Sequence, residues 1–579
     1  MQQAVALHNA GRLAEAEKVY RDVLQKDPRN ADALQLLGLI EHQKGNNERA
    51  VELIRKAVTI RPRAEFLINL AQAHKALGKT QEALEATQRA LQMAPNIPEG
   101  WNNLGSLLKD LNRSAEAADA FRKAIALRPN YAVAHSNLGN ALAQLGDAKG
   151  SEAALRRAVT IDPNYAEGYS NLAHLLTVLG RLEESVLLCR RAIALKPQLG
   201  AAYSNLGKAL HAQGLMDEGN EALRVGAAAD PTNAQLHENL LGCFNHTTRW
   251  SPEEALAAHI AWAKRFAEPA TPPAPIAPHA NDKSPDRKLR IGYVSPDLRR
   301  HSVTYFLEPI FANCDRGAFE IFAYSNTEKL DDVTERLRNM CDGWRDIRAL
   351  NDDEAAALIR QDRIDILIDL AGHTMNNRLA IFGRKPAPVQ MTYLGYAGTT
   401  GLSTVDYRIT DEISDPPGMT DAHYTEKLIR LSPPFLCYSP PPDAPAVADA
   451  PVLTNDFIRF GSFNNAAKIR EETLALWSRV LAAVPNSRLV LKARALGDVG
   501  ARRRIFDGFA RHGIDAARLE LIEAGQTLVD HLDAYKVMDV ALDTYPYNGT
   551  TTTCEAMWMG VPVVTRAGRT HVSRVGCLS

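Results

Sequence analysis

The sequence predicts an all-α superhelix of repeated helix pairs, followed by an α/β region in which two lobes carry parallel sheets. Three observations support this prediction. Prolines recur at a nearly constant spacing up to Pro231, glycines recur in a second register, and β-rich runs alternate with helical patterns from Leu289 onward. A chain of 579 residues also exceeds the size of a single hydrophobic core, so a modular organisation is expected.

The N-terminal region contains an internal repeat. Prolines close successive segments at intervals of 33 or 34 residues, at Pro28, Pro62, Pro95, Pro129, Pro163, Pro197 and Pro231. Glycines mark a turn inside the segments at Gly11, Gly45, Gly78, Gly146, Gly180 and Gly214, and Asn112 fills the remaining place in this register. This period is the signature of tetratricopeptide repeats. About seven stacked helix pairs over residues 1–232 would form a curved superhelix suited to extended peptides.

A second periodicity consists of asparagines in the first helix of the repeats. They recur every 34 residues, at Asn69, Asn103, Asn137, Asn171, Asn205 and Asn239. Asparagine is a poor helix former, so this recurrence needs a reason. A structural reason is a hydrogen bond to a neighbouring helix. We predict instead a ladder of amides that holds the main chain of protein substrates, and the structural alternative stays open.

The rest of the chain divides by composition. Residues 233–268 are helical but lose the repeat pattern, as a capping unit does, and a Pro-rich linker is expected over 269–288. A first α/β lobe is expected over 289–440, a Pro-rich connector over 441–455 and a second lobe over 456–579.

The strands expected in the two lobes are short β-rich runs separated by helical patterns. They read LRIGYVS, FEIFAYS, DILIDLAG and VQMTYLG in the first lobe, and FIRFGSF, SRLVLKA, LELIEA, DVALDT and VPVVT in the second. Strands that alternate with helices indicate parallel sheets, which bind ligands beyond the carboxyl ends of their strands. We therefore expect a site in a cleft between the lobes.

Three of these strands are followed by residues capable of chemistry, namely His301, His373 and Lys468. A single histidine is more often a structural residue, and a single lysine is usually solvated. Their shared location beyond strand ends strengthens the case for a functional role, and the structural alternatives stay open.

A run of four threonines, residues 550–553, begins the helix that follows the strand DVALDT. Free backbone N–H groups and the helix dipole bind phosphate at such a position, so a diphosphate is the expected ligand. The structural alternative is a capping box formed by Thr552 and Glu555. The chain has no P-loop, no G-x-G-x-x-G fingerprint after a strand and no metal-ligand spacing, which argues against nucleotide hydrolases, dinucleotide oxidoreductases and metal sites.

The composition limits the possible partners. The chain has 67 Lys and Arg against 68 Asp and Glu, so we predict neither nucleic acid nor a membrane as a partner. Its seven cysteines are scattered and form no C-x-x-C pair, which predicts reduced, buried thiols. The first 20 residues lack the features of a signal peptide, and no apolar run reaches the length of a membrane span, so a soluble cytoplasmic protein is expected.

Several segments together resemble the O-GlcNAc transferase and SPINDLY family of glycosyltransferases. They are SPDLRRHSV, DLAGHT, KPAPVQMTYLGYAGTTG, DYRITD, YTEKL, FGSFNNAAKI, LDTYPYNGTTTTCEAMWMGVPVVT and GRTHVSRVG. The resemblance implies an all-α tetratricopeptide superhelix followed by an α/β GT-B fold of two Rossmann-like lobes. It also implies inverting, metal-independent transfer of a sugar from a nucleotide diphosphate to Ser or Thr, with no cofactor besides this nucleotide sugar.

The resemblance also implies roles for individual residues. Lys468 would lie against the donor diphosphate, with Asn465 in the same loop, and His301 would lie beside donor and acceptor as a general base or a positioning group. His373 would be a further catalytic residue, with Thr374 beside it.

Further donor contacts are implied in the second lobe. Thr550, Thr551 and Thr552 would hold the phosphates, Glu555 the ribose, and His531 would lie near the base.

The donor is the least determined of these implications. UDP-GlcNAc is the leading expectation, but Ala534 stands where animal enzymes have an arginine, and GTTTTCE is closer to SPINDLY, whose members use GDP-fucose. A non-catalytic scaffold, or transfer to a different acceptor such as Asn or a glycan, also fits the sequence. Members of the family continue beyond SRVG, so a truncated second lobe is expected.

Overall fold

A computed structural model of the chain describes residues 1–268, 278–432, 434–523, 525 and 527–578. The chain divides into two compact units. The first comprises Met1–Leu175 with Ala194–Lys196, and the second comprises Leu176–Ile193 with Pro197–Ser579. Residues 269–277 of the expected Pro-rich linker lie outside the described residues.

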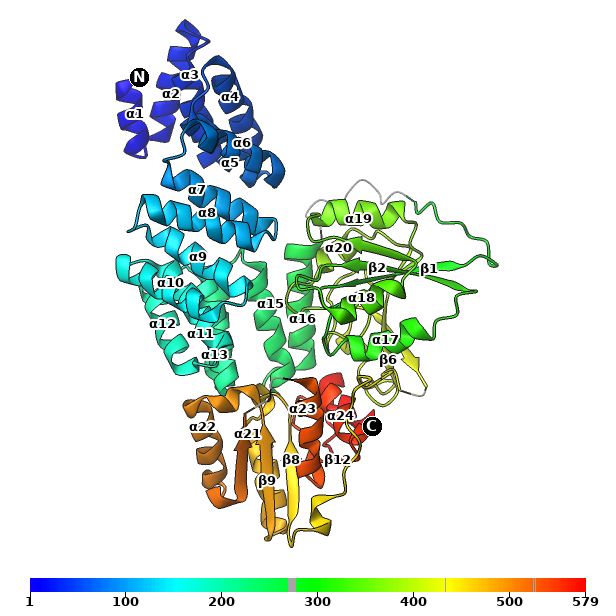
Figure 1. The fold of residues 1–579 in the computed structure, drawn as a ribbon. Helices are drawn as coiled ribbons and strands as arrows, with labels where there is room; N and C mark the ends of the chain where they lie inside the picture. The colour runs from blue at the N-terminus through cyan, green and yellow to red at the C-terminus, as the bar shows by residue number, and fades with distance from the viewer. Residues whose placement is uncertain (269–277, 433, 524, 526, 579) are drawn as a thin grey trace. The chain divides into compact units, whose positions relative to one another are not determined.

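The N-terminal region consists of α-helices that follow one another in antiparallel pairs (Figure 1). The helices are α1 (Gln2–Asn9), α2 (Leu13–Lys26), α3 (Ala31–Gln43), α4 (Asn47–Ile60), α5 (Ala64–Ala76), α6 (Thr80–Met93), α7 (Pro98–Asp110), α8 (Ser114–Leu127), α9 (Ala132–Gln144), α10 (Ala148–Ile161), α11 (Ala166–Val178), α12 (Leu182–Leu195), α13 (Gly200–Gln213) and α14 (Met216–Ala229). The helix pairs expected from the proline period are therefore present.

The turns inside the repeats have the expected left-handed conformation. The six glycines of the turn register have φ between 71° and 86°, and Asn112, which replaces glycine between α7 and α8, has φ 59°. Residues with a Cβ rarely adopt this region, and asparagine is among the exceptions. The prediction from the glycine register is confirmed, including its one substitution.

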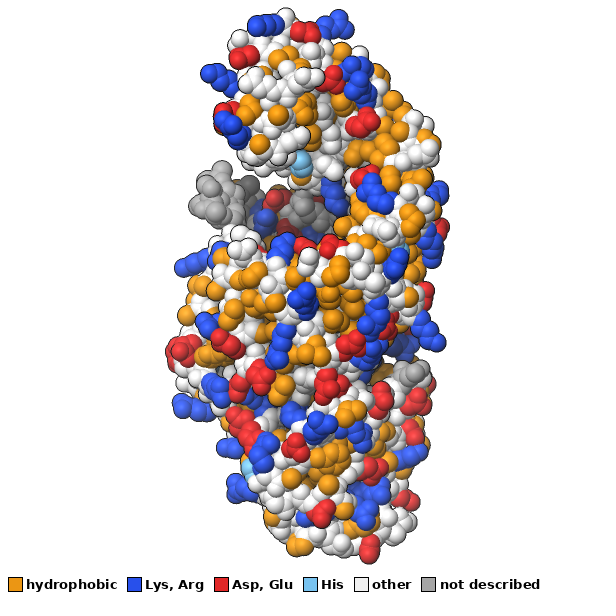
Figure 2. Space-filling view, turned by 90° about the vertical axis from the view of Figure 1, so that its left-hand side faces the viewer, with side chains coloured by type: hydrophobic (Ala, Val, Ile, Leu, Met, Phe, Trp, Pro, Cys, Tyr) orange, Lys and Arg blue, Asp and Glu red, His pale blue; other side chains and the backbone are white. Residues whose placement is uncertain are grey.

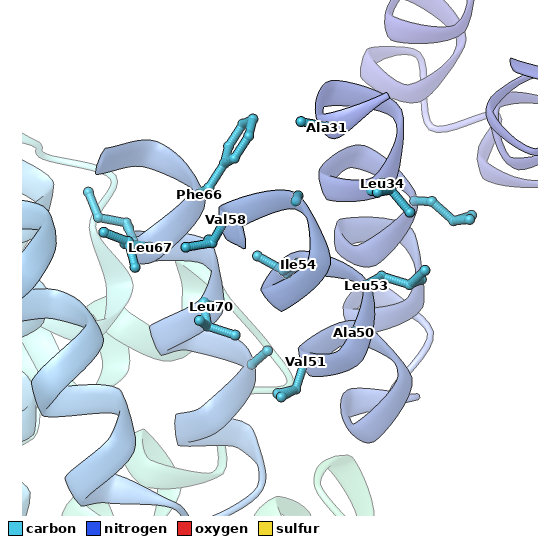
Figure 3. Packing of buried hydrophobic residues seen from close by; sticks show 14 of the residues in the cluster. Ala31, Leu34, Ala50, Val51, Leu53, Ile54, Val58, Phe66, Leu67 and Leu70 are labelled. Carbon is cyan, nitrogen blue, oxygen red and sulfur yellow. The ribbon is translucent and has the colours of Figure 1, made fainter. Parts of the chain in front are cut away.

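The repeat core depends on close approach within each helix pair. A Cβ on Gly38 of α3 would lie 2.5 Å from the Ile54 side chain of α4, and one on Gly105 of α7 would lie 2.6 Å from the Phe121 ring of α8. Glycine in the first helix thus makes room for a large side chain in the second. Figure 3 shows the same layer, in which Ile54 and Val58 of α4 belong to one apolar cluster with Leu67 of α5.

The first α/β lobe contains a seven-stranded sheet in the order β3-β2-β1-β4-β5-β6-β7, and every pair of neighbours is parallel. Its strands are β1 (Leu289–Ser295), β2 (Phe319–Ser325), β3 (Gly343–Asp346), β4 (Ile366–Asp369), β5 (Val389–Thr392), β6 (Tyr407–Asp411) and β7 (Lys427–Leu431). The helices are α17 (Thr304–Ala312), α18 (Asp332–Asn339), α19 (Asp352–Gln361) and α20 (Leu379–Gly383), with a short turn η3 (Asp421–His423).

Successive side chains of β1 point to opposite faces of this sheet, and each face has its own core. Tyr293 packs with Leu307 of α17 and Leu337 of α18, whereas Val294 packs with Ile359 of α19 and Phe382 of α20. Helices thus cover both faces, as a parallel sheet requires. The strand order reverses between β1 and β4, and doubly wound sheets bind ligands at this point.

The second lobe repeats this design with five parallel strands in the order β10-β9-β8-β11-β12. Its strands are β8 (Ile458–Ser462), β9 (Ser487–Lys492), β10 (Leu519–Ile522), β11 (Val540–Leu542) and β12 (Val563–Val564). The helices are α21 (Glu471–Ala483), α22 (Val499–Arg511), α23 (Leu528–Asp533) and α24 (Thr551–Trp558). The short turns are η4 (Pro451–Leu453), η5 (Ala466–Lys468), η6 (Arg494–Gly497), η7 (Ala516–Arg518), η8 (Ala534–Val537), η9 (His571–Ser573) and η10 (Val575–Leu578). The order reverses between β8 and β11.

The nine strands expected from the sequence are present, and three further strands were missed. β3 and β7 form the two edges of the first sheet and are short or charged, as edge strands often are. β6 carries Arg408 in a strand buried in the sheet, which hides its β pattern. The Arg408 side chain is 1% exposed and donates to the carbonyl oxygens of Gly398 and Tyr396 at 2.8 and 3.0 Å.

Helices α15 (Ala234–Cys243) and α16 (Pro252–Trp262), with the turns η1 (Phe244–His246) and η2 (Ala263–Ala267), belong to the core of the first lobe. Trp262 and Leu241 share an apolar cluster with Val294 and Leu367. His259 Nε2 lies 2.9 Å from the Tyr396 hydroxyl, which donates to Leu241 O at 3.2 Å. This helical segment is thus continuous with the lobe that follows it.

The surface carries both signs of charge. On the face shown in Figure 2, basic and acidic side chains are interspersed, in agreement with the near-neutral net charge of −1. Within the described ranges, no helix is both long and apolar enough to span a bilayer. All seven cysteines are described and are free thiols; Cys189 and Cys243 are buried, but Cys437 is exposed, so the expectation of uniformly buried thiols is wrong.

Substitutions at Gly146 can show the effect of a left-handed backbone conformation alone, because an added side chain would meet no steric clash there. Its φ is 83°, and an added Cβ would meet nothing within 4 Å. We predict that Gly146→Val lowers the free energy of unfolding by about 1–2 kcal/mol, because a β-branched residue is strained in the left-handed region. Gly146→Asn is the matched control and should cost less than half as much, since Asn112 adopts this conformation natively. Denaturant unfolding, with hydrogen exchange of α9 and α10, measures both; equal effects would contradict the assignment.

Candidate functional site

Lys468 lies in the turn η5, directly beyond the carboxyl end of β8. The turn is held by Asn465, which is exposed and whose side-chain oxygen accepts a hydrogen bond from Ala467 N at 3.0 Å. Asn465 therefore shapes the loop that carries Lys468. This placement agrees with the shared loop expected for the two residues, and the donor contacts assigned to them stay predictions.

The Lys468 ammonium is bound by groups that follow β11. Its Nζ donates to Asn548 O at 2.8 Å and lies 3.9 Å from the centre of the Tyr547 ring. Burial lowers the pKa of Lys468 to about 8, and the nearby Asp543 carboxylate offsets part of this effect. A cation is thus held at the point where the strand order of the second sheet reverses, which is where a doubly wound sheet binds its ligand.

A network of buried polar groups joins the ends of β8 and β11. Asn464 is 6% exposed; its Oδ1 accepts from Thr552 Oγ1 at 3.0 Å, and its Nδ2 donates to Asp543 Oδ1 at 3.4 Å. Asp543 also accepts from Gly549 N at 2.7 Å and from Thr565 Oγ1 at 2.8 Å, although burial raises its pKa. The sequence interpretation missed Asn464, Asp543 and Asn548, although they follow two strand ends and lie in segments that resemble the family.

The threonine run begins helix α24, with Thr550 as the residue before its first turn. No side chain caps this helix, and Thr552 hydrogen bonds to Asn464 rather than to the helix end. The capping box proposed for Thr552 and Glu555 is therefore wrong, because Thr552 lies inside the first turn. The first backbone N–H groups of α24 lack intrahelical acceptors, and the helix dipole gives this end a partial positive charge. Thr550, Thr551 and Thr552 are partly exposed at this end.

Glu555 points away from solvent one turn further along α24. Its carboxylate is buried and accepts from His531 Nε2 at 3.1 Å and from the Tyr535 hydroxyl at 3.3 Å. The structure thus brings Glu555 and His531 together, as neighbouring donor contacts would require. Lys492, which the sequence interpretation also missed, donates to His531 O at 3.2 Å from the end of β9.

Residues of the first lobe face this group. Burial, followed by the Glu555 carboxylate, raises the pKa of the Tyr305 and Tyr438 hydroxyls. Ser439 N donates to Tyr305 O at 2.9 Å, so the two tyrosines lie on adjoining segments. Glu555 and the beginning of α17, which carries Tyr305, therefore lie close together where the two lobes meet.

His301 lies beyond the carboxyl end of β1, just before α17. Its Nε2 is 3.8 Å from Asp297 Oδ1, and Val303 N donates to its Nδ1 at 3.4 Å. Burial lowers the pKa of the imidazole, while Asp297 acts in the opposite direction. The ring is thus neutral at neutral pH and partly exposed at the switch point of the first sheet.

His373 follows β4, but its side chain does not face solvent. It is 5% exposed, and its ring packs against Trp262 at 4.6 Å, His259 at 5.0 Å and Tyr396 at 5.3 Å. Its Nε2 hydrogen bonds to Thr400 O at 2.9 Å, and burial lowers its pKa far below the usual value. This position favours the structural alternative over the predicted catalytic role, because the ring anchors α16 to the lobe.

The neighbouring Thr374 is partly exposed and donates to Ala371 O at 2.9 Å. Its hydroxyl therefore serves the turn after β4. A donor contact for Thr374 stays a prediction.

The recurring asparagines are partly buried, and three of them bridge successive repeats. Asn137 donates to Asn102 Oδ1 at 3.0 Å, Asn171 to Ser136 Oγ at 3.0 Å and Asn239 to Ser204 Oγ at 2.6 Å. Each bond joins a repeat to the one before it, as the structural alternative requires. Because each amide has two N–H groups and an oxygen, these contacts leave further hydrogen-bonding capacity for a peptide.

Among the described side chains, no three His, Cys, Asp or Glu residues are grouped as they would be around a metal ion. The groups assembled where the lobes meet are instead the Lys468 ammonium, the N-terminus of α24 and the Glu555 carboxylate. Such a set of groups can bind an anion together with a polyhydroxylated ligand.

Comparison with protein families supports this description. The model described as "Glycosyl transferase family 41" matches residues 273–438 and 448–578. The model described as "Tetratricopeptide repeat" matches residues 1–65, 68–132, 102–166 and 136–200. Together these matches cover the repeats up to residue 200 and both α/β lobes.

Similar proteins carry related names. A probable UDP-N-acetylglucosamine–peptide N-acetylglucosaminyltransferase SPINDLY from Petunia hybrida is 43% identical over 351 residues, which are 60% of this chain and 37% of that protein. The corresponding SEC protein of Arabidopsis thaliana is 33% identical over 48% of this chain and 29% of its own length. The chain thus spans a little over a third, or less, of these relatives.

A solved structure is also similar. It is a mutant O-GlcNAc transferase from Thermobaculum terrenum, with a TM-score of 0.71 and 40% identity over 77% of this chain and 84% of that one. The similarity extends to the GT-B arrangement of a repeat array followed by two parallel α/β sheets, so the expected fold class is confirmed.

The buried charge of Lys468 should lower stability. The unfolded chain holds this proton more tightly than the folded protein does, so the penalty is complete below pH 8 and fades as the pH rises toward about 10.4. We predict that Lys468→Met raises the free energy of unfolding by about 1–2 kcal/mol at pH 7, after allowing for the lost bond to Asn548 O.

Urea unfolding at pH 7 and pH 10 measures this effect. The gain should shrink at the higher pH. Lys536→Met is the control, since that side chain is 51% exposed, and it should change stability by less than about 0.5 kcal/mol. A Lys468→Met protein that is less stable than the native one at pH 7 would contradict the assignment.

Proposed function

We propose that this chain, which belongs to glycosyl transferase family 41, transfers a sugar from a nucleoside diphosphate to Ser or Thr hydroxyls of polypeptides. N-acetylglucosamine from UDP-GlcNAc is the first candidate donor. The observation that carries the proposal is the Lys468 ammonium, held at the switch point of the second sheet next to the threonines that begin α24. Transfer would be inverting and independent of metal.

Lys468 and α24 would stabilise the leaving group. Negative charge grows on the diphosphate as its bond to the sugar breaks, and a cation fixed beforehand offsets this charge without reorganising. The free N–H groups at Thr550, Thr551 and Thr552 would bind the remaining phosphate oxygens. Asn464 supports the arrangement, because it joins the Lys468 loop to Thr552.

Glu555 and His531 would hold the nucleoside end of the donor. A buried carboxylate accepts ribose hydroxyls well, and His531 is 24% exposed beside it. Tyr305 and Tyr438 of the first lobe face the same carboxylate, so the nucleoside would be enclosed between the lobes.

His301 would act on the acceptor side. Its neutral imidazole can accept the proton that the Ser or Thr hydroxyl loses, or can orient that hydroxyl for attack. Either role requires His301 to face the sugar carbon opposite the diphosphate, as inversion demands.

The repeats would guide protein substrates to the region where the two lobes meet. Extended chains suit the inner surface of a superhelix, and the asparagine amides can bind a main chain in any sequence. A cytoplasmic location accompanies this proposal, as for an enzyme whose partners are proteins and nucleotide sugars.

Two competing functions rest on specific features. Ala534 in η8 and the run GTTTTCE favour the SPINDLY-like use of GDP-fucose. A scaffold without turnover would fit the repeats alone and would not need a lysine with a lowered pKa beside a helix N-terminus. Transfer to Asn or to a glycan would use the same donor site.

The first test compares donors. The full chain is incubated with a lysate and radiolabelled UDP-GlcNAc or GDP-fucose, and mass spectrometry maps the modified residue. We expect label on Ser or Thr from UDP-GlcNAc, and a loss of about 10²–10³-fold in Lys468→Ala. Lys536→Ala is the matched control, since this lysine is 51% exposed and pairs with Asp533 on the surface.

The outcomes separate these functions. Label from GDP-fucose alone would establish the second donor, and label on Asn or on a glycan would establish another acceptor. No Lys468-dependent transfer from either donor would exclude the enzymatic proposal and leave the scaffold.

A second test concerns the asparagine ladder. We expect the triple variant Asn137→Ala, Asn171→Ala and Asn205→Ala to lower the glycosylation of proteins at least about fivefold more than that of a short peptide. Ser136→Ala is the matched control, because it removes the partner of Asn171 but leaves the amide in place. Equal losses on both substrates, or a loss in Ser136→Ala as large as in the triple variant, would establish the structural role instead.

A further inference from the structure

The segment Thr570–Cys577 crosses from the second lobe to the first. The His571 side chain is 5% exposed, and its Nδ1 lies 2.7 Å from Asp415 Oδ2, in the loop after β6. Arg574 Nε donates to Ile413 O at 2.8 Å, and Val575 is buried in the core of the first lobe. Three successive contacts thus fasten this segment to the first lobe.

The bond between His571 and Asp415 is charged and directional. Although burial opposes ionisation, the His571 ring and then Arg408 hold the pKa of Asp415 well below its usual range. Asp415 also accepts from Thr410 Oγ1 and from the Tyr424 hydroxyl. An ionised carboxylate accepts only, so His571 Nδ1 must carry the donated proton.

The same segment also contacts the loop after β11, in which Asn548 accepts a hydrogen bond from Lys468. Asn548 N donates to Val572 O at 3.0 Å, and Asn548 O accepts from Lys468 Nζ at 2.8 Å. A Cβ on Gly576 would lie 2.3 Å from Asp543 Oδ2, so the backbone of the segment packs directly on this carboxylate. A continuous path of hydrogen bonds and one peptide bond therefore runs from Asp415 through His571, Val572 and Asn548 to Lys468.

We propose that His571 and Asp415 are positioning residues, which fix Lys468 against the donor diphosphate only while the two lobes are joined. This inference rests on the proposed transferase function and adds a link to it. Neither residue hydrogen bonds directly to Lys468, to the threonines of α24 or to Glu555. Their effect passes through Asn548, whose carbonyl oxygen faces the ammonium and whose N–H faces Val572.

Through this path, the contact between the two lobes determines whether a fixed cation, Lys468, is available to offset the charge on the departing diphosphate. When Asp415 holds His571, the carbonyl of Asn548 is fixed and the ammonium stays half-buried over Tyr547. When the bond is absent, Val572 and Asn548 lose their anchor, and the ammonium can turn toward water. The donor would still bind through Glu555 and His531, but its diphosphate would leave without a fixed cation.

The experiment measures the pKa of Lys468 in the whole 579-residue chain without any donor. Competitive labelling of lysines at a series of pH values, followed by peptide mass spectrometry, reports this pKa directly. The other groups that act on this titration are Asp543 and His246, and neither is changed. We expect about 8 in the native protein and a rise of about one unit or more in His571→Leu, as the ammonium regains water.

His571→Asn is the matched rescue, because its amide nitrogen occupies nearly the place of Nδ1 and can donate to Asp415. It should keep the pKa within about 0.3 units of the native value. Turnover with the active donor should follow the same order, with kcat about tenfold lower in His571→Leu and KM for the donor changed less than about threefold. Asp415→Ala, which removes the acceptor for His571 Nδ1, should resemble His571→Leu.

Circular dichroism establishes which variants are folded, and Asp415→Ala carries the test if His571→Leu is not folded. The link would be overturned if the Lys468 pKa is unchanged in whichever of His571→Leu and Asp415→Ala is folded. It would also be overturned if His571→Asn changes this pKa as much as His571→Leu does. If Lys468 responds as expected but the native protein transfers no sugar, the link stands and the proposed function fails.

Discussion

Every strand in both sheets runs parallel to its neighbours, and this constraint decides where chemistry can occur. Parallel strands deliver their carboxyl ends to a single edge, and the reversal of strand order opens that edge between two particular strands. In the second lobe these are β8 and β11, which supply Lys468 and the threonine run. In the first lobe they are β1 and β4, which supply His301 and His373. Residues as far apart in the sequence as Asn464 and Asp543 are neighbours for this reason alone.

The repeats and the sheets differ in how well the sequence predicts them. The turn glycines could be predicted from their spacing and from the preference of glycine for positive φ, and the same reasoning predicted the left-handed conformation of Asn112. Three strands escaped notice because strand patterns depend on what surrounds them. Arg408 reads as a surface residue, yet it is buried where two backbone carbonyls compensate its charge.

The candidate site shows the same division. Lys468 and the threonines follow recognisable strand ends, and their local motifs could be read. Asn464, Asp543 and Asn548 lie within segments that resemble the family, but no role could be assigned to them, because their role depends on each other across the sheet. Thr552 illustrates the opposite error: the sequence around it fits a capping pattern, but the helix begins two residues earlier than that pattern requires. His373 looks reactive in the sequence and is enclosed by aromatic rings in the fold.

The aromatic packing of α16 has a practical consequence. Trp262 and His259 fill the side of the first lobe where His373 and Tyr396 lie, and a Cβ on Gly383 would lie 2.2 Å from Ala267 O. A shortened chain that begins at the first strand would uncover these rings and the buried imidazole of His373. Any separation of the α/β lobes from the repeats should therefore retain α15 and α16, since these two helices, which look like the end of the superhelix, are part of the core of the first lobe.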